Sequence, residues 1–241
     1  MAKSKKPVKT NERVKSGIET IDKMIGGFRK NSINLIAGSA GSGKTIMAMQ
    51  FLVEGLKNGE NVLYITFEEK KDKTYGDMLG FGWDLAEYEK KGKLFFIEYT
   101  PEQIKRLITE GGGEIETIIE KTKTTRLVID SITSFALLYQ DELTKKEAAL
   151  AFFELISKWN CTAILTSQMM INETIISPGV EFEVDSITLL YHALQKGIRK
   201  RGIEIIKMRG TPTPEKVFPF KISKKGLEVN IKSVLSINGN G

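Results

Sequence analysis

Residues 38–45 read Gly38-Ser39-Ala40-Gly41-Ser42-Gly43-Lys44-Thr45, which satisfies the pattern G-x-x-x-x-G-K-[ST] in full. An apolar strand pattern at 33–37 precedes this stretch, and an amphipathic helix pattern at 45–56 follows it. The glycines allow backbone N–H groups to curl around a polyphosphate with no Cβ in the way. The following helix directs its positive end at the anion. The stretch therefore predicts a site for a nucleoside triphosphate.

The loop sequence also predicts roles for individual residues. We expect the backbone of residues 38–46, which ends at Ile46, to surround the phosphates. Lys44 is placed for the β- and γ-phosphates, and Thr45 is placed for a Mg²⁺ ion. The loop therefore predicts a nucleoside triphosphate and Mg²⁺ as cofactors.

A carboxylate on a second strand supports the metal assignment. The stretch Val128-Ile129-Asp130 ends an apolar strand pattern with an acid, the expected place for the group that orders Mg²⁺ through water. Many strands end in Asp, so the pattern is weak alone. The pattern gains support because Asp130 lies on a different strand of the same predicted sheet from the one that leads into the phosphate loop. We assign Asp130, with Thr45, to the metal.

Three more polar residues follow predicted strands. Glu68 and Glu69 come directly after the strand pattern 61–67, and Gln168 comes after the pattern 161–167. One glutamate can face a water near the γ-phosphate while its neighbour serves structure, since adjacent strand residues point to opposite sides. The alternative for the glutamates is a solvated loop. Gln168 can sense a phosphate or cap a loop.

Composition restricts the class of protein. The chain has 241 residues, one cysteine and one histidine. This length suits one α/β domain with a large core. Cys161 lies in an apolar stretch and is expected to be a buried core residue, and His192 alone gives zinc no ligand set. No run approaches the roughly 18 apolar residues that span a bilayer, and no apolar segment follows the first lysines. We expect a cytoplasmic protein without a membrane segment.

The charges are unevenly distributed. The chain carries a formal net charge of +6. Residues 31–193 have an excess of acids, whereas residues 194–241 have 11 basic and three acidic side chains. Such a chain offers two surfaces that could complement each other between subunits. Nucleic acid attraction to the basic ends is the less favoured alternative, because nothing makes it specific.

The order of patterns predicts the architecture. We expect a mobile basic tail at 1–12, a single domain at 13–232 and a mobile tail at 233–241. Strand patterns at 33–37, 61–67, 94–97, 126–130 and 161–167 alternate with helix patterns, of which 14–28, 101–121 and 144–159 are the clearest. Gly111-Gly112-Gly113 interrupts the second of these helices. This alternation predicts a mostly parallel sheet with helices on both faces.

The last 60 residues change character. Strand patterns at 186–191, 201–208, 217–222 and 227–231 follow one another with short connections. They predict antiparallel strands that extend the sheet. We find no internal repeat and no second domain.

Several blocks in a fixed order carry a resemblance to a known family. They are Ser16-Gly17-Ile18, the loop 38–45, Tyr64-Ile65-Thr66-Phe67-Glu68-Glu69, Leu79-Gly80-Phe81-Gly82-Trp83, Val128-Ile129-Asp130-Ser131, Leu165-Thr166-Ser167-Gln168 and Lys207-Met208-Arg209-Gly210. With them the chain resembles the KaiC-like branch of the RecA superfamily of ATPases, in the single-domain form common in archaea. The resemblance runs from about Val14 to Val229.

The resemblance implies a RecA-like core that assembles into a homo-oligomeric ring, commonly a hexamer, with ATP between neighbouring subunits. It implies that Glu68 is the catalytic base with Glu69 beside it. It also implies that Lys207 and Arg209 reach into the adjacent subunit's nucleotide, where a cation would neutralise charge on the transferred phosphoryl group. The alternative for this basic pair is a solvated hairpin edge.

Three features depart from the family pattern. Glu19 stands where the family often has proline, which affects nothing catalytic. Residues 181–184, before Asp185, contain no Ser or Thr, so self-phosphorylation as in the phosphorylated clock repeat is not expected. The chain also has one repeat where the clock proteins have two. We expect slow ATP hydrolysis with a regulatory or signalling role and an unidentified protein partner.

Two other functions stay open at the level of sequence. An ATP-binding assembly scaffold with little hydrolysis would have the same loop and metal site. A DNA recombinase or repair paralogue would need cationic loops along a DNA channel. The candidate segment, 169–184, has no Lys or Arg and four acids if Asp185 is included. A small-molecule kinase is disfavoured further, because no arginine-rich lid segment is present.

Overall fold

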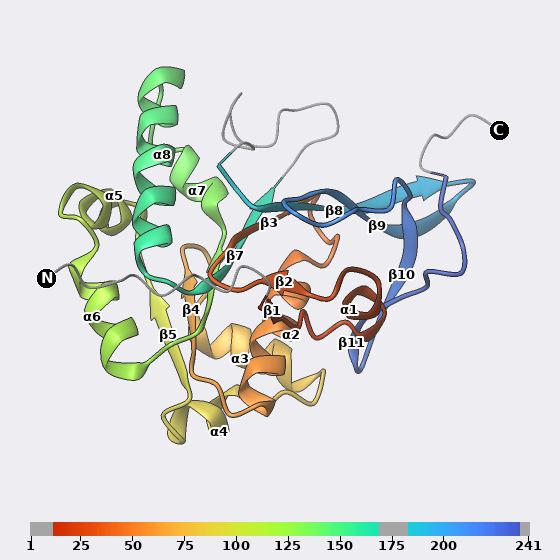
Figure 1. The fold of residues 1–241 in the computed structure, drawn as a ribbon, viewed down its shortest axis with the longest axis horizontal. Coiled ribbons are helices and arrows are strands. Elements are labelled where there is room, and N and C mark those ends of the chain that lie inside the picture. The colour runs from red at the N-terminus through yellow and green to blue at the C-terminus, as the bar shows by residue number, and fades with distance from the viewer. Residues whose placement is uncertain (1–11, 169–182, 237–241) are drawn as a thin grey trace, which may run out of the picture.

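One nine-stranded sheet forms the centre of the molecule (Figure 1). The computed structural model describes residues 12–168 and 183–236. The strands run in the order β11-β10-β9-β8-β3-β7-β6-β4-β5. The five strands expected between residues 33 and 167 are β3 (Ile33–Gly38), β4 (Val62–Thr66), β5 (Leu94–Glu98), β6 (Arg126–Asp130) and β7 (Thr162–Gln168). The mostly parallel α/β architecture expected from the sequence is confirmed.

The parallel part of the sheet places the phosphate loop at its centre. Strand β3 pairs in parallel with β7 on one side and with β8 (Ser186–Gln195) on the other. Every residue of β3 and β4 is buried, because these strands are covered on both faces. The carboxyl ends of β3, β4, β6 and β7 therefore meet at one edge of the sheet, where the loop and the polar residues follow.

Antiparallel strands complete the sheet on the side of β8. Strand β9 (Ile198–Met208) pairs with β8, β10 (Phe218–Ser223) pairs with β9, and β11 (Gly226–Val229) pairs with β10, all antiparallel. Figure 1 shows β8 and β9 running side by side away from the helices. This confirms the predicted antiparallel extension.

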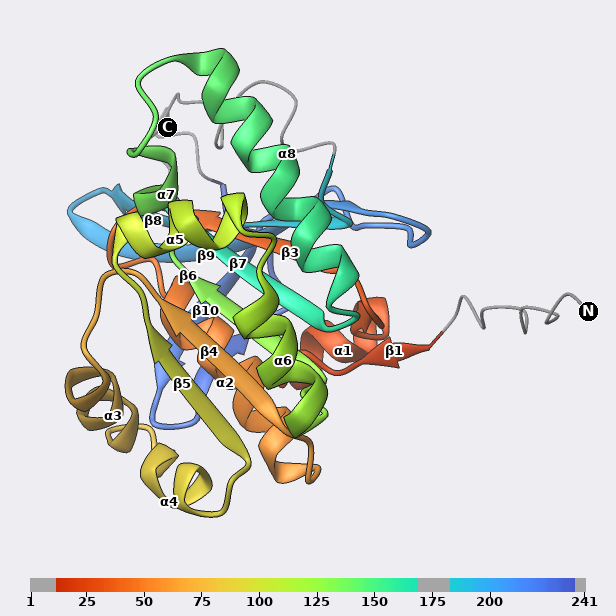
Figure 2. The same cartoon turned by 90° about the vertical axis from the view of Figure 1, so that its left-hand side faces the viewer.

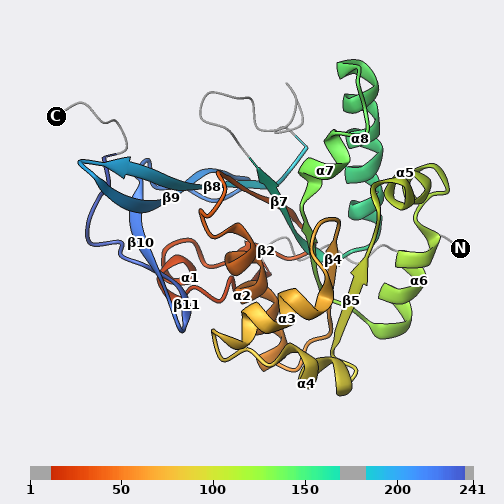
Figure 3. The ribbon, with the colours of Figure 1, turned by 180° about the vertical axis from the view of Figure 1, so that it is seen from behind.

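Helices cover both faces of the sheet (Figures 2 and 3). One face packs against α1 (Glu19–Ile25), α2 (Lys44–Lys57), α3 (Lys71–Leu79) and α4 (Leu85–Lys90). The other packs against α5 (Pro101–Thr109), α6 (Gly113–Thr122), α7 (Ile132–Ala136) and α8 (Glu142–Lys158). The two helix layers form two apolar clusters with the sheet. Successive residues of a strand face one cluster and then the other: Tyr64 faces α2, whereas Leu63 and Ile65 face the opposite layer.

The N-terminal segment differs from its prediction. The pattern 14–28 predicts one helix, but the structure has a shorter α1 between two strands, β1 (Arg13–Val14) and β2 (Phe28–Arg29), which pair antiparallel. Gly26 and Gly27 have φ of 80° and 97°, which ends the helix and returns the chain. A Cβ on Gly27 would lie 2.4 Å from the Val14 carbonyl oxygen, so the strand pairing requires glycine there.

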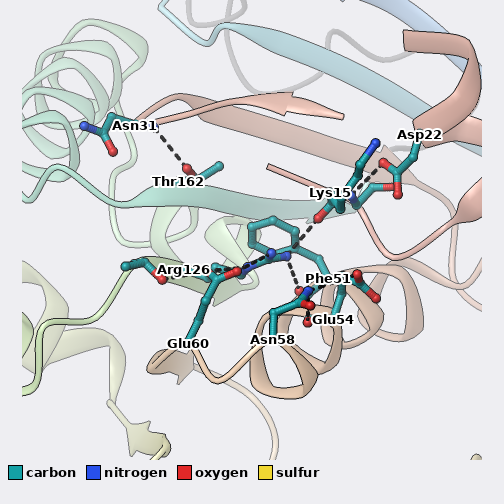
Figure 4. Close-up of polar contacts among 11 residues, drawn as sticks. Lys15, Asp22, Asn31, Phe51, Glu54, Asn58, Glu60, Arg126 and Thr162 are labelled. Atoms are coloured by element: carbon teal, nitrogen blue, oxygen red, sulfur yellow. Dashed lines mark hydrogen bonds and ion pairs between the residues drawn. The ribbon is translucent and has the colours of Figure 1, made fainter. Parts of the chain in front are cut away.

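A buried ion pair anchors this segment to α2 (Figure 4). Arg126, at the start of β6, is 2% exposed and donates to both carboxylate oxygens of Glu60, at 2.9 Å and 2.7 Å. Its Nη1 donates to the backbone oxygens of Lys15 and Phe51, each at 2.8 Å. The guanidinium therefore ties the N-terminal segment to the helix that begins at the phosphate loop.

The glycine run at 111–113 separates two helices, as expected. Helix α5 ends at Thr109, and Gly112 is the N-cap of α6 with φ of 72°. A Cβ on Gly112 would lie 2.7 Å from the Leu155 side chain, so the turn packs closely on α8. The helices α3, α4 and α7 were not predicted from the sequence.

Candidate functional site

The phosphate loop connects β3 to α2 at the carboxyl edge of the sheet. Gly41 and Gly43 have φ of 71° and 104°, conformations that a side chain would strain. Gly38 approaches β8 so closely that a Cβ would lie 2.3 Å from the Leu190 carbonyl oxygen. The Ser42 Oγ is buried within the loop without a hydrogen-bond partner in the described chain. The loop is therefore a compact cradle of backbone that closes around the buried Ser42 side chain.

Lys44 opens helix α2. Its Nζ donates to the backbone oxygens of Gly38 and Ser39, at 3.0 Å and 3.1 Å. Burial lowers the pKa of this ammonium, while the nearby carboxylates of Asp130 and Glu68 act in the opposite direction. The cation thus lies over the concave side of the loop, in the electrostatic range of two acids.

Asp130 lies beside Thr45, as the sequence predicts. The Thr45 Oγ1 donates to the Asp130 Oδ2 at 2.7 Å. The same oxygen accepts from the Tyr64 hydroxyl at 2.9 Å, and Asp130 Oδ1 accepts from the Thr166 hydroxyl. A hydroxyl and a carboxylate on adjacent elements are the hard oxygen donors that Mg²⁺ prefers.

Glu68 and Glu69 point to different partners. The Thr66 hydroxyl accepts from the backbone N–H groups of both glutamates, at 3.2 Å and 3.0 Å, and this turns the chain after β4. Glu68 Oε1 then accepts from the Ser131 and Ser134 hydroxyls, at 2.7 Å and 2.5 Å. Glu69 forms an ion pair with Lys73 at 2.9 Å, on helix α3.

Helix α7 contributes to this arrangement although the sequence did not predict it. It carries Ser134, and its Thr133 hydroxyl accepts from the backbone N–H of Gln168 at 2.7 Å. Gln168 is the last residue of β7 and pairs with Gly38, the first residue of the loop. Its exposed side chain therefore lies at the loop's edge.

A pocket of about 750 Å³ opens beside the loop. Its walls include Ile46 and Glu69, two residues assigned from the sequence. Its apolar wall includes Met78 and Phe81, from the end of α3 and the turn after it, and Ile222 of β10. A recess of this size next to a phosphate cradle, with polar and apolar walls, suits the rest of a nucleotide.

Arg201 is a pocket residue that the sequence did not indicate. It lies on β9, opposite His192 of β8. Its Nη2 donates to the Gly41 backbone oxygen at 3.3 Å, and its Nε is buried without a partner in the described chain. His192 packs against the same glycine, where a Cβ would lie 3.4 Å from its Nδ1. An arginine beside a phosphate loop suits bidentate phosphate binding.

Lys207 and Arg209 lie far from the loop of their own chain. Lys207 pairs with Ile187 at the start of β8, and its Nζ donates to the Val184 backbone oxygen at 2.8 Å. The Arg209 backbone N–H donates to the Asp185 oxygen at 2.8 Å. This is the amino end of β3, where Ile33 lies five residues, or about 17 Å at 3.3 Å per residue, from Gly38. The structure does not bring this basic pair to the site.

The remaining predictions have mixed outcomes. Cys161 is 3% exposed and its thiol donates to the Thr124 backbone oxygen, so its predicted burial is confirmed. Burial raises the pKa of this thiol to about 12. Helices long and apolar enough to cross a membrane are absent from the described residues. The segment proposed for a DNA channel, 169–184, lies almost entirely outside the described residues.

Comparisons with known proteins agree with this geometry. A family profile described as "ATPase: KaiC" matches residues 14–233. The chain is 35% identical over 229 residues to circadian clock protein KaiC3 of Synechocystis, covering 90% of this chain but only 45% of that protein. It is 32% identical to UPF0273 protein PH0284 of Pyrococcus horikoshii, covering 92% and 96% of the two chains.

A solved structure has the same fold. The crystal structure of the KaiC-like protein PH0186 from Pyrococcus horikoshii superposes with a TM-score of 0.81 and 32% identity, covering 91% of this chain and 99% of that one. The described strand order and antiparallel extension are therefore those of a RecA-like core. Together, the phosphate loop, the fold and the match over residues 14–233 establish that the chain belongs to the KaiC family of P-loop ATPases.

Proposed function

We propose that the chain hydrolyses ATP with Mg²⁺, in a homo-oligomeric ring whose nucleotides lie between neighbouring subunits. The observation that carries the proposal is the meeting of Lys44, Thr45, Asp130 and Glu68 at the carboxyl ends of three strands. They supply a phosphate-binding cation, two metal donors and a base. Residues 13–232 form the proposed ATPase domain.

Each residue has one task. Lys44 and the loop backbone bind the β- and γ-phosphates. Thr45 and Asp130 hold Mg²⁺, which when bound offsets negative charge on the phosphate oxygens. Glu68 orients a water and accepts its proton as the water oxygen bonds to the γ-phosphorus and the bridging oxygen leaves with ADP. The Ser131 and Ser134 hydroxyls fix the direction of the Glu68 carboxylate.

Arg201 and the pocket bind the rest of the nucleotide. The Arg201 guanidinium lies at the loop, where its Nη2 donates to the Gly41 backbone oxygen, so it offers a charge-assisted donor to a phosphate bound there. The apolar wall of Ile46, Phe81 and Ile222 suits the base and ribose. Glu69 and Gln168 line the same opening or its edge.

The distance between the two parts of the proposed site supports the ring. Lys207 and Arg209 lie at the amino edge of the sheet, and this distance prevents them from serving their own loop. A neighbour placed head to tail would present this edge to the loop, which is how a heterologous contact closes into a ring. The basic C-terminal strands would then meet the acidic body of the next subunit.

The proposed role is regulatory or signalling, in the cytoplasm, with an unidentified protein partner. Two relatives are named for the circadian clock, one as a circadian clock protein and the other as a circadian clock oscillator protein. Their names support a slow ATPase whose state is read by other proteins. A hexamer is the proposed ring size. Binding of nucleic acid is not part of this proposal.

The test compares ATP binding with phosphate release. Wild-type protein should bind a fluorescent ATP analogue in the presence of Mg²⁺ and release phosphate. Lys44→Ala should weaken binding at least tenfold, because a charge-assisted contact to phosphate is worth about 1.5–3 kcal/mol. Lys57→Ala, at the exposed opposite end of the same helix, is the matched control and should behave as wild type.

Three outcomes would change the proposal. Binding without phosphate release above the Lys44→Ala background would replace hydrolysis with the scaffold function. Failure of the wild type to bind ATP at millimolar concentration would contradict the proposal as a whole. Salt-sensitive binding of single-stranded DNA by the wild type would favour the recombinase alternative.

A further inference from the structure

Three neighbouring strands present polar side chains on the face that packs against α2. In β6, Val128 faces α2, and alternation returns Asp130 to the same face. Tyr64 of β4 pairs with Val128, which makes it the diagonal neighbour of Asp130. Thr166 of β7 follows Ile164, the partner of Val128, by two residues. Strand register therefore places Tyr64 and Thr166 on either side of Asp130.

Both neighbours donate hydrogen bonds to the carboxylate. The Tyr64 hydroxyl reaches Oδ2 at 2.9 Å, and the Thr166 hydroxyl reaches Oδ1. Thr45, from the first turn of α2, reaches Oδ2 at 2.7 Å. Each carboxylate oxygen thus has a donor from a neighbouring strand, and these two bonds fix the rotation of the carboxylate about its bond to Cβ.

The donors are neutral, and this matters for binding a cation. A lysine or arginine at either position would offset the carboxylate charge and compete for its lone pairs. A hydroxyl orients the carboxylate and leaves the negative charge in place. Neutral donors therefore suit Asp130, whose carboxylate must bind a cation from outside the chain. Glu60 has no such task, and its carboxylate pairs with the Arg126 guanidinium.

The tyrosine is held rigidly. Tyr64 is fully buried, and its ring stacks on Phe96 of β5 with centroids 5.0 Å apart and an interplanar angle of 27°. Phe96 is its partner in the strand register. Burial and ring stacking therefore hold the hydroxyl in place against Asp130.

From these contacts we infer that Tyr64 and Thr166 are positioning residues, which orient Asp130 for the Mg²⁺ that it holds with Thr45. The inference rests on the proposed function. Phenylalanine would pack in the apolar cluster equally well. A buried tyrosine hydroxyl costs free energy unless it has a hydrogen-bond partner. The hydrogen bond that orients the Asp130 carboxylate therefore explains why a hydroxyl is present at this position.

Metal affinity, measured apart from turnover, tests the inference. The measurement titrates Mg²⁺ against binding of a fluorescent ATP analogue, and repeats it with Mn²⁺ followed by its paramagnetic resonance signal. Tyr64→Phe and Thr166→Val should each raise the metal concentration for half-saturation about tenfold, the usual effect of removing a hydrogen bond behind a metal ligand. Binding of the analogue in EDTA should match the wild type.

Matched variants separate the hydroxyl from the packing. Thr166→Ser keeps the hydroxyl and should restore wild-type metal affinity, which a purely steric role of the methyl group would not allow. Tyr99→Phe removes a phenol that donates to Glu114 at 3.4 Å, away from Asp130, and should leave the metal titration unchanged. Tyr64 and Thr166 lie on different strands, so a folding defect in one variant leaves the other to decide.

The outcomes distinguish this inference from the function on which it rests. If Asp130→Asn weakens metal binding while Tyr64→Phe and Thr166→Val match the wild type, the inference is wrong and the proposed function stands. If the wild type and Asp130→Asn respond to metal alike, the metal site itself is wrong and both proposals fall. Tenfold shifts in both variants with rescue by Thr166→Ser would establish the positioning role.

Discussion

The two edges of the parallel sheet treat their cations in opposite ways. At the amino edge, Arg126 donates to both oxygens of Glu60 and to two backbone oxygens, and its guanidinium lies 4.7 Å from the Phe51 ring centroid. At the carboxyl edge, Lys44 reaches only backbone oxygens of its own loop, and the Arg201 Nε is buried without a partner in the described chain.

This difference separates a structural cation from one that awaits a ligand. Arg126 has its donors satisfied within the chain, so it can hold an N-terminal segment and a helix together but has nothing left for a partner. The cations at the carboxyl edge have unused capacity beside a pocket. Unsatisfied donors are costly in a folded protein, and a bound polyphosphate would remove that cost.

The largest expected effect lies at the carboxyl edge. Glu68→Gln should lower ATP turnover by about 10²–10⁴-fold, because the amide cannot accept the proton from water. ATP binding should change by less than about threefold, since the loop and metal donors are intact. Glu98→Gln is the control, because this carboxylate is on the neighbouring strand and pairs with Lys70. Phosphate release equal to wild type in Glu68→Gln would remove Glu68 from the role of base.

The amino edge should respond in stability instead. Arg126→Met should lower the free energy of unfolding by about 3 kcal/mol, the low end for breaking a buried ion pair, because Glu60 is 28% exposed. Denaturant unfolding measures this loss, and ATP affinity of the folded variant should be unchanged. Arg106→Met, which removes an exposed pair with Glu110, should cost under about 0.5 kcal/mol. A large loss of ATP affinity in Arg126→Met would contradict the division between edges.

The residues at the two edges also show which parts of the site could be predicted from the sequence. The loop, Asp130 and Glu68 could be predicted from local patterns, because each lies at the end of a strand that is recognised by its apolar run. Arg201 approaches Gly41 only because β9 pairs with β8 and β8 with β3. That pairing joins residues 160 positions apart, and no local pattern contains it.

The error at residues 14–28 has a similar cause. Its apolar spacing fits a helix, but Gly26 and Gly27 and the pairing of β1 with β2 limit α1 to seven residues. Tyr64 and Thr166 were missed for the reason that applies to Arg201. Alternation along one strand does not relate it to the next, and only the pairing of β6 with β4 and β7 brings both hydroxyls to Asp130.

A substitution of Arg201 gives a smaller test of the division between a ligand-binding carboxyl edge and a structural amino edge. Arg201→Gln should raise the dissociation constant for ATP about tenfold, through loss of a charge-assisted hydrogen bond. Lys200→Gln is the matched control, because adjacent strand residues point to opposite faces. Unfolding free energy should change little in both, in contrast to Arg126→Met. Equal ATP affinity in the two variants would place Arg201 outside the site.

The smallest effect concerns pH. Burial lowers the pKa of Lys44 below its ordinary value of 10.5. The charged form binds phosphate, so ATP affinity should be complete at neutral pH and fall as pH rises toward that lowered pKa. Lys44→Arg, which stays charged, should have weaker but constant affinity between about pH 7 and pH 10. A wild-type affinity equally constant over this range would contradict the assignment of Lys44.

The central claim is that the two edges of neighbouring subunits complete one site. The direct measurement is ATP turnover of Lys44→Ala protein mixed with Arg209→Ala protein, each impaired alone. Random mixing in a head-to-tail ring would pair an intact loop with an intact Arg209 at about a quarter of the interfaces. We predict that turnover in the mixture rises well above that of either variant. A mixture no more active than the average of its components, with exchange of subunits verified, would contradict the claim.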